Sequence, residues 1–477
     1  MAIEVFEKPK IKTKKLNIQL YSKGSSDTFV ESLDYVPYIF LSKLNDPNPD
    51  PIEGTTIDPK DIIYFKLFNS RFVPEMELFC NDSKGILFND MYPLDHDTIL
   101  SIFVKSNSDD NFPIRMDFRI TEYETIKYIP DSKDLKYLIK GILDLDDLHF
   151  TRYESRRGTS YNIIKDIALQ MNLGWASNVK NSDDEMTWIN PSDTYREFIK
   201  DITKYAFVNE NSFVWTAIDL QYNLNYIDIQ SEMNNYLNEE QSLTITRLIK
   251  NDEQRIVPLY LTNNNAFNMT NKYISKFDIL NQSFKVNLDK FYRMKGTWYN
   301  KNENTVYKQF VTEFESDQTK LSSGDGQLLT LIDKQSKLYS ENINDEYFIG
   351  KIDTDNNVHK NYALAKVLNK YNLDAMQKMS MVITLNQLNF SIKRFQNIRI
   401  EIYNPMDLLS RDADERNPLD NINKRLSGFW YVTGINYMFR KDGGNEQEIT
   451  LVRRDLSLDY GKGTNERNDF RKFIKNK

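Results

Sequence analysis

The sequence is poor in residues on which several classes of fold and site depend. Cys80 is the one cysteine, so no disulfide can form within the chain and a disulfide framework is excluded. Cys80 lies in the apolar segment 76–80, where a packed, inert thiol is expected and a reactive thiol is the alternative. Glycine accounts for 16 of 477 residues, which argues against a fold organised by glycine-rich phosphate loops.

Long apolar runs are also missing. No segment approaches the roughly 18 apolar residues that a membrane-spanning helix needs, and the N-terminal residues lack the apolar core of a signal peptide. We therefore expect a protein that is neither secreted by a visible signal nor inserted in a membrane, and that assembles in a reducing cytoplasm. A net charge of −7 makes the chain a poor general binder of nucleic acid.

Catalytic and metal-binding motifs are absent from the sequence. The histidines His96, His149 and His359 have no second His or Cys three or four residues further on, as a zinc site on a helix would need. A segment resembling a calcium loop has Val358 in place of the glycine and Leu364 in place of the glutamate. No Gly-x-Ser-x-Gly motif occurs. The sequence predicts no catalytic, cofactor-binding or metal-binding residues, and we expect that the protein is not an enzyme.

Two acidic clusters could supply the paired carboxylates of a glycosidase. They are Asp144, Asp146 and Asp147, and Asp183, Asp184 and Glu185. Such an enzyme needs two carboxyl groups roughly 5–10 Å apart across a cleft. Both clusters lie in hydrophilic segments with no accompanying sign of a cleft. We interpret them as solvated loops.

The aromatic content favours a β-rich protein. There are 28 tyrosines and 28 phenylalanines, and such side chains suit pleated, half-buried surfaces. Residues 1–130 are expected to form a β-rich domain, because apolar runs there are bounded by turn-forming residues. The expected strands are 62–68, 76–80, 98–104 and 114–122.

Residues 131–240 differ in character and predict a compact α+β module. A first helix is expected to follow Thr159 and to end before Gly174, where a left-handed residue is needed. A second helix is expected to begin with Asn190 as its N-cap and Pro191 in its first position. Strands are expected at 213–218 and 224–229.

The remaining sequence is mixed and then β again. In residues 241–378 we expect strands at 243–249 and 284–288 and a helix at 362–376. From 379 to 477 the pattern returns to strands, including the strictly alternating run 398–402. The fold class is therefore α+β and mostly β, with barrel-like ends around a helical middle.

Residues 427–456 form the most informative segment and predict one β-hairpin. Its first strand carries large apolar side chains on both faces, so both faces must be covered, inside a barrel or by a partner chain. We predict an assembly interface formed by six residues of this hairpin and of the strand beside it: Phe429, Trp430, Tyr431, Ile398, Ile400 and Ile402. The alternative is an ordinary barrel core within one chain.

Short packing and turn patterns also recur along the chain in a definite order. They occupy 140–144, 153–155, 158–161, 173–178, 184–191, 198–199, 222–226, 359–362, 389–390 and 428–432. In this order they resemble the central baseplate hub protein of T-even-type contractile-tailed bacteriophages. The resemblance covers roughly residues 60–458 and is strongest over 138–230 and 359–456, and its specificity comes from the number and order of the patterns.

The resemblance implies a homotrimer in the baseplate of the virion tail. Its fold would hold two tail-tube-like β-barrel domains with α+β domains between them. The first barrel would lie in 1–130, and the second in part of 241–378 together with 379–477. Three chains would present six barrels and join a hexameric tail tube to a trimeric central spike.

The resemblance also implies the partners of such a hub. They would be the central spike protein, tail tube or tube-initiator proteins and the inner baseplate wedge proteins, while DNA would pass through the channel during ejection without specific binding. A tail-tube initiator, or the hub of another contractile injection machine, is the first alternative. A cell-wall-degrading tail enzyme is the second.

Overall fold

The structure is a computed structural model in which strands dominate. It describes residues 5–7, 36–43, 55–89, 94, 97–105, 114–127, 135–209, 212–235, 259–261, 274–281, 293–300, 305–312, 351–352, 358–359, 361–362, 365–366, 368–369, 373, 379–386, 388–389, 392–402, 426, 428–440 and 444–453. The three longest helices of this part lie between residues 160 and 235. The expected α+β, mostly β class is confirmed.

The first strand group is antiparallel and follows the order β4-β5-β8-β7-β6-β2-β3. Its strands are β2 (Val36–Lys43), β3 (Thr55–Ile57), β4 (Ile62–Asn69), β5 (Glu75–Asn81), β6 (Thr98–Lys105), β7 (Ile114–Lys127) and β8 (Lys136–Leu143), with the short helices η2 (Pro59–Asp61) and α1 (Ile86–Asn89). The four expected strands are present, because apolar residues alternate between the core and the surface along them. β8 lies beyond residue 130 and pairs with β5 and β7.

The second strand group follows the order β15-β19-β22-β21-β20-β14. It consists of β14 (Leu259–Leu261), β15 (Ile274–Asn281), β19 (Met379–Leu385), β20 (Asn397–Ile402), β21 (Gly428–Arg440) and β22 (Glu446–Arg453). The predicted hairpin is confirmed as β21 and β22. A separate sheet holds β16 (Arg293–Asn300), β17 (Thr305–Thr312) and β18 (Lys351–Ile352).

Some expected elements fall outside the residues that the structure describes. The strands expected at 243–249 and 284–288 lie there entirely. Of the helix expected at 362–376, the described residues are helical.

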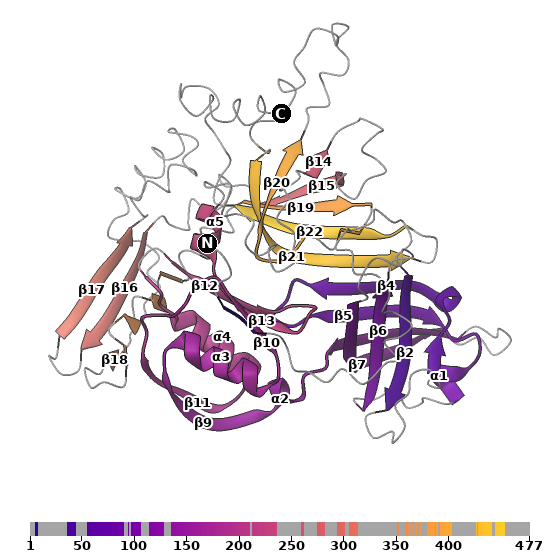
Figure 1. The fold of residues 1–477 in the computed structure, drawn as a ribbon, viewed down its shortest axis with the longest axis horizontal. Helices are drawn as coiled ribbons and strands as arrows, with labels where there is room; N and C mark the ends of the chain where they lie inside the picture. The colour runs from indigo at the N-terminus through magenta and orange to yellow at the C-terminus, as the bar shows by residue number, and fades with distance from the viewer. Residues whose placement is uncertain are drawn as a thin grey trace, which may run out of the picture.

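An α+β module lies between the two strand groups in sequence, except for its strand β1, which precedes both groups. Its mixed sheet has the order β1-β10-β13-β12, and a two-stranded ribbon pairs β9 with β11. The strands are β1 (Val5–Glu7), β9 (Thr151–Gly158), β10 (Gly174–Ser177), β11 (Met186–Thr194), β12 (Val214–Ile218) and β13 (Asn223–Asp228), and the helices are α2 (Asp146–His149), α3 (Ser160–Gln170), α4 (Tyr195–Tyr205) and α5 (Ile229–Asn235). Figure 1 shows α3 and α4 between the ribbon and the sheet.

The ends of α3 and α4 can be compared with the helix ends predicted from the sequence. α3 follows Thr159 as expected, and Thr159 is its N-cap, since its hydroxyl accepts a hydrogen bond from the Asn162 N–H. The left-handed residue after α3 is Asn172, with φ of 58°, whereas Gly174 begins β10, so the expected role of Gly174 was wrong. The expected start of the second helix at Pro191 was also wrong.

The second helix starts later because strand pairing continues through Pro191. β11 runs on through a bulge and stays paired with β9 as far as Thr194. Thr194 then caps α4 by accepting a hydrogen bond from the Glu197 N–H. The pairing of the ribbon therefore overrides the local preference of proline for a first helical turn.

One pair of strands joins the two strand groups into a single sheet. On one edge, β21 pairs with β20 through residues 428–431 and with β4 through residues 435–440. A bulge lies between these stretches, at Val432 and Gly434. A Cβ atom added to Gly434 would lie 2.6 Å from Ser70 Cβ, so only glycine fits this close approach.

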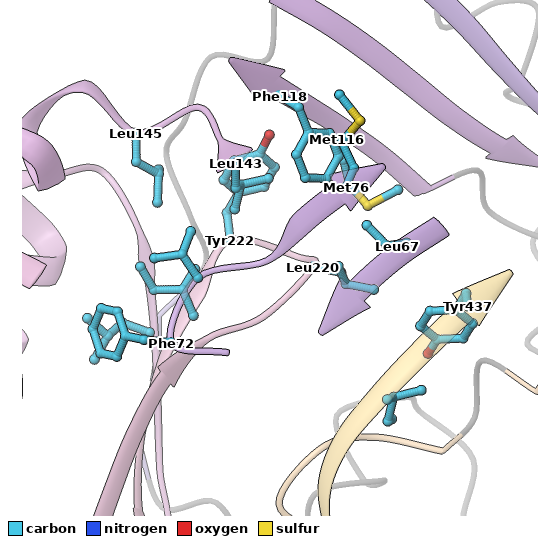
Figure 2. Close-up of a cluster of buried hydrophobic side chains, with 14 of the residues drawn as sticks. Leu67, Phe72, Met76, Met116, Phe118, Leu143, Leu145, Leu220, Tyr222 and Tyr437 are labelled. Carbon is cyan, nitrogen blue, oxygen red and sulfur yellow. The ribbon is translucent and has the colours of Figure 1, made fainter. Parts of the chain in front are cut away.

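The main hydrophobic core is continuous across both strand groups and the module. Figure 2 shows Leu67 and Met76 of the first group, Leu220 of the module and Tyr437 of β21 in one cluster. The module is also held by hydrogen bonds, since the Tyr222 hydroxyl accepts from the Asp117 N–H at 2.9 Å. Among the described residues, none of the helices has the length and apolar character that a membrane crossing requires.

Candidate functional site

The predicted interface residues lie in the second strand group, and one of them, Tyr431, also contacts the module. Ile398, Ile400 and Ile402 on β20 are buried, as are Trp430 and Tyr431 on β21. The backbone of Phe429 pairs with that of Arg399, and its side chain lies outside the described residues. The structure therefore brings the six positions together on two neighbouring strands.

The apolar strand β21 is covered on both faces within one chain. Trp430 belongs to the main core, and its indole N–H donates to the Leu426 carbonyl at 2.9 Å. Tyr431 belongs to a second cluster with Phe213, Ile227 and Phe395. The burial of these side chains matches the alternative given for them, a core within one chain.

Two buried carboxyl groups lie beside Tyr431. Asp228 and Glu232 are 4% and 3% exposed. The Asn178 amide donates to the Glu232 carboxylate and to the Asp228 carbonyl, both at 2.9 Å. Burial, against the lowering effect of hydrogen bonds from backbone N–H groups and with a smaller contribution from Glu232, raises the pKa of Asp228 to about 7. Burial also raises the pKa of Tyr431 well above its usual value. Burial therefore favours the uncharged forms of both Asp228 and Tyr431.

One of the two acidic clusters fits the expected solvated loop at Asp183 and Glu185, which are exposed, but not at Asp184. Asp184 is fully buried and not part of a solvated loop. Its carboxylate accepts from the Ser160 N–H at 2.8 Å, the Ser182 hydroxyl at 2.6 Å and the Phe207 N–H at 2.9 Å. The carboxylate therefore anchors the start of α3 to the segment after α4, which is a structural role.

The other acidic cluster forms ion pairs at partly exposed positions. Asp144 pairs with Arg119 at 2.9 Å, and Asp147 pairs with Arg152 at 2.6 Å. Among the described residues, no group of three or more His, Cys, Asp or Glu side chains could hold a metal ion. Cys80 is fully buried, and burial raises the pKa of its thiol, as expected of a packed cysteine.

Sequence reasoning missed a continuous outer face of the joined sheet. One row of directly opposed residues crosses eight strands from β15 to β7: Lys276, Thr384, Glu448, Asn436, Phe68, Glu75, Ile142 and Arg119. None of the eight is buried, whereas the residues that alternate with them, such as Ile383, Ile449 and Leu67, belong to the core. We call this surface the outer sheet face. The alternation of apolar and polar residues along each strand indicated an exposed face. Only the pairing of β21 with β4 shows that these faces join into one surface.

Charges of opposite sign alternate across the outer sheet face. Lys66, Glu77, Lys140 and Glu122 lie opposite one another on β4, β5, β8 and β7. The Lys140 ammonium lies 3.0 Å from the Glu122 carboxylate, and Lys66 lies 3.8 Å from Glu77. This ladder contains two cations and two anions, so it presents no net charge to a ligand.

Comparisons with solved structures find similarity to tail proteins at low sequence identity. No family model and no curated protein match the sequence. The tail protein from Neisseria meningitidis MC58 has a TM-score of 0.47 and 10% identity, covering 88% of this chain and 97% of its own. The 43 kDa tail protein of prophage MuSo2 from Shewanella oneidensis has a TM-score of 0.49 and 11% identity, covering 89% and 100%. A Francisella PdpA–VgrG complex has a TM-score of 0.45 and 10% identity, covering 91% and 55%.

Proposed function

We propose that the protein is a structural component of a phage tail, the trimeric baseplate hub that joins a six-fold tail tube to a three-fold central spike. The observation that carries this proposal is the edge-to-edge pairing of β21 with β4. It gives one chain two strand groups in a fixed relation. Three such chains offer six strand groups, which is what an adaptor between six-fold and three-fold symmetry requires.

The division of the chain follows from the same proposal. The first strand group supplies the first tube-like domain, and the second strand group supplies the second. The α+β module packs against both groups, because it donates Leu220 to the main core and Phe213 to the cluster around Tyr431. The six predicted interface residues then act by holding this three-way junction together.

The outer sheet face is the surface that we assign to the channel wall. It is continuous over both strand groups, and its charges are balanced along the ladder of Lys66, Glu77, Lys140 and Glu122. A wall of balanced charge releases few counterions from DNA and therefore holds the phosphate backbone weakly. DNA would pass such a wall during ejection without specific binding.

The partners follow from the place of a hub in the baseplate. They are the central spike, the tail tube or its initiator and the inner wedge proteins, with the complex located in the virion tail after assembly in the host cytoplasm. A tube initiator, or a hub of another contractile injection machine, would share the paired strand groups. It is distinguished by which partner it captures.

The mass of the purified protein in solution tests the proposal. Mass photometry should give a species near three times 56.4 kDa, alone or after addition of the spike protein encoded with it. A monomer that stays a monomer when spike and tube proteins are added would overturn the proposal. A zymogram on host peptidoglycan tests the enzymatic alternative, which a lytic band would favour.

A further inference from the structure

Three parts of the chain converge on one buried arginine. Arg394, in the segment before β20, is 7% exposed. Its Nε–H donates to the Thr433 carbonyl at 2.6 Å, and its two terminal nitrogens donate to the carbonyls of Ser70, at 3.1 Å, and Arg71. Thr433 lies at the bulge of β21, while Ser70 and Arg71 follow β4. The guanidinium therefore spans the junction between the two strand groups.

The module contributes a third contact to the same guanidinium. The ring of Trp215 on β12 lies 5.8 Å from the Arg394 guanidinium carbon, and the ring of Phe395 lies 4.7 Å from it. Phe395 has a φ of 67°, a left-handed conformation that costs energy for a side chain of this size. Its N–H donates to the Val432 carbonyl at 2.9 Å, which fixes the segment beside the bulge.

The contacts of Arg394 indicate that it fixes the relative orientation of the segments it binds, more than it adds to the stability of the fold. Burial lowers the pKa of Arg394 to about 10, so that the group keeps its charge at neutral pH. Its hydrogen-bond acceptors in the described part of the chain are all main-chain carbonyls. A buried cation without a carboxylate partner is costly, and an apolar residue of similar volume would avoid that cost. The planar guanidinium, however, holds its N–H donors in fixed directions, which an apolar residue cannot do.

We propose that Arg394 is a positioning residue that fixes the relative placement of the two strand groups, and so sets the spacing at which one chain offers two positions of a ring. The second half of this statement rests on the proposed hub function. The first half concerns a single chain and stands without it. Gly434 complements Arg394, because the close approach of its backbone to Ser70 leaves no room for a shift.

Distance measurements between the two strand groups test the proposal. Nitroxide labels are attached at Glu122→Cys on β7 and Lys276→Cys on β15, whose native side chains are 60% and 67% exposed. Cys80 is buried and does not compete for the label. The parent protein should give one narrow distance distribution by pulsed electron resonance. Arg394→Lys should broaden the distribution and shift its mean, because an ammonium cannot hold three carbonyls in one plane.

A matched control separates positioning from general stability. Arg156 binds Glu154, Gln170 and Tyr195 inside the module, far from the junction in sequence. Arg156→Lys should lower the melting temperature and leave the distance distribution unchanged. If Arg394→Lys does not fold, Arg394→Met removes the buried charge at similar volume and should still broaden the distribution.

The possible outcomes distinguish this proposal from the hub function. An unchanged narrow distribution in both Arg394 variants overturns the positioning role, whatever the oligomeric state. A broadened distribution together with a parent protein that never forms trimers supports the positioning role and rejects the hub. Where the parent protein forms trimers, Arg394→Lys should lose them while Arg156→Lys retains them.

Discussion

At the scale of single residues, Asp228 has the most informative environment. Its carboxyl group is buried, accepts hydrogen bonds from the N–H groups of Phe213 and Gln230, and lies close to Glu232. Burial raises its pKa to about 7 from an ordinary value near 3.8. Between these two pKa values, the unfolded chain has lost the proton while the folded protein still holds it. The free energy of unfolding therefore falls as the pH rises from 3.8 to about 7, and this group causes no further change at higher pH.

The substitution Asp228→Asn should remove this dependence on pH. The parent protein should lose on the order of a few kcal/mol between pH 4 and pH 8 through this group, and the amide variant should not. Thermal unfolding at several pH values measures the difference between the two curves. Parallel curves would show that Asp228 is already ionised in the folded protein.

Ile400 tests the burial of the predicted interface strand. Its side chain is fully buried within the chain, so Ile400→Asp should lower the free energy of unfolding by roughly 3–5 kcal/mol or prevent folding. Ile189 is the matched control because its side chain is 68% exposed on the ribbon. Urea unfolding compares them, and the interpretation fails if Ile400→Asp is as stable as Ile189→Asp.

Single buried polar residues were the least predictable feature of the chain. Asp184 stands in a hydrophilic segment, so the sequence indicated a solvated loop, yet its carboxylate is buried beneath the start of α3. Arg394 likewise has no local signal, since its carbonyl partners lie 39 and more than 300 positions away. The burial of such groups depends on contacts between distant segments, which periodicity does not report.

At the scale of elements, the bulge of β21 is the position where the sheet changes partners. Gly434→Ala would place a Cβ atom 2.6 Å from Ser70 Cβ and should cost about 1–3 kcal/mol. The double variant Gly434→Ala with Ser70→Gly removes that contact and should recover part of the loss. A double-mutant cycle from denaturant unfolding measures the coupling, and strictly additive effects would contradict the close approach.

Regular strands were predictable, whereas their partners were not. The alternation of apolar residues located β4, β5, β6 and β7, and turn chemistry located the hairpin of β21 and β22. The start of α4 was misplaced because β11 keeps its pairing with β9 as far as Thr194. The pairing of β21 with β4 joins segments more than 350 residues apart, and no local pattern indicates it.

At the scale of the whole molecule, the balance of charge on the outer sheet face has a direct consequence for DNA. Glu122, Glu124 and Glu448 are exposed on this face. Their replacement by lysine in one variant should create affinity for duplex DNA that falls with rising salt, because the lysines of three copies would face one channel. The parent protein should bind weakly at the same salt concentration.

A control variant distinguishes a channel wall from an ordinary surface. Glu185, Glu197 and Asp201 are exposed on the module, with side chains 67%, 54% and 57% exposed. Their replacement by lysine changes the net charge equally but places the charges outside the assigned channel. Filter-binding assays should show tighter binding for the outer-face variant. Equal affinities would contradict the assignment of the channel wall.

The central claim of the proposed function is that each chain, with its two paired strand groups, fills two positions of a ring. Electron microscopy of the purified complex, with the spike protein present, measures this most directly. We expect a three-fold ring of three chains in which six strand groups surround an open channel lined by the outer sheet face. A ring of six chains, or an assembly in which that face is packed away from any channel, would contradict it.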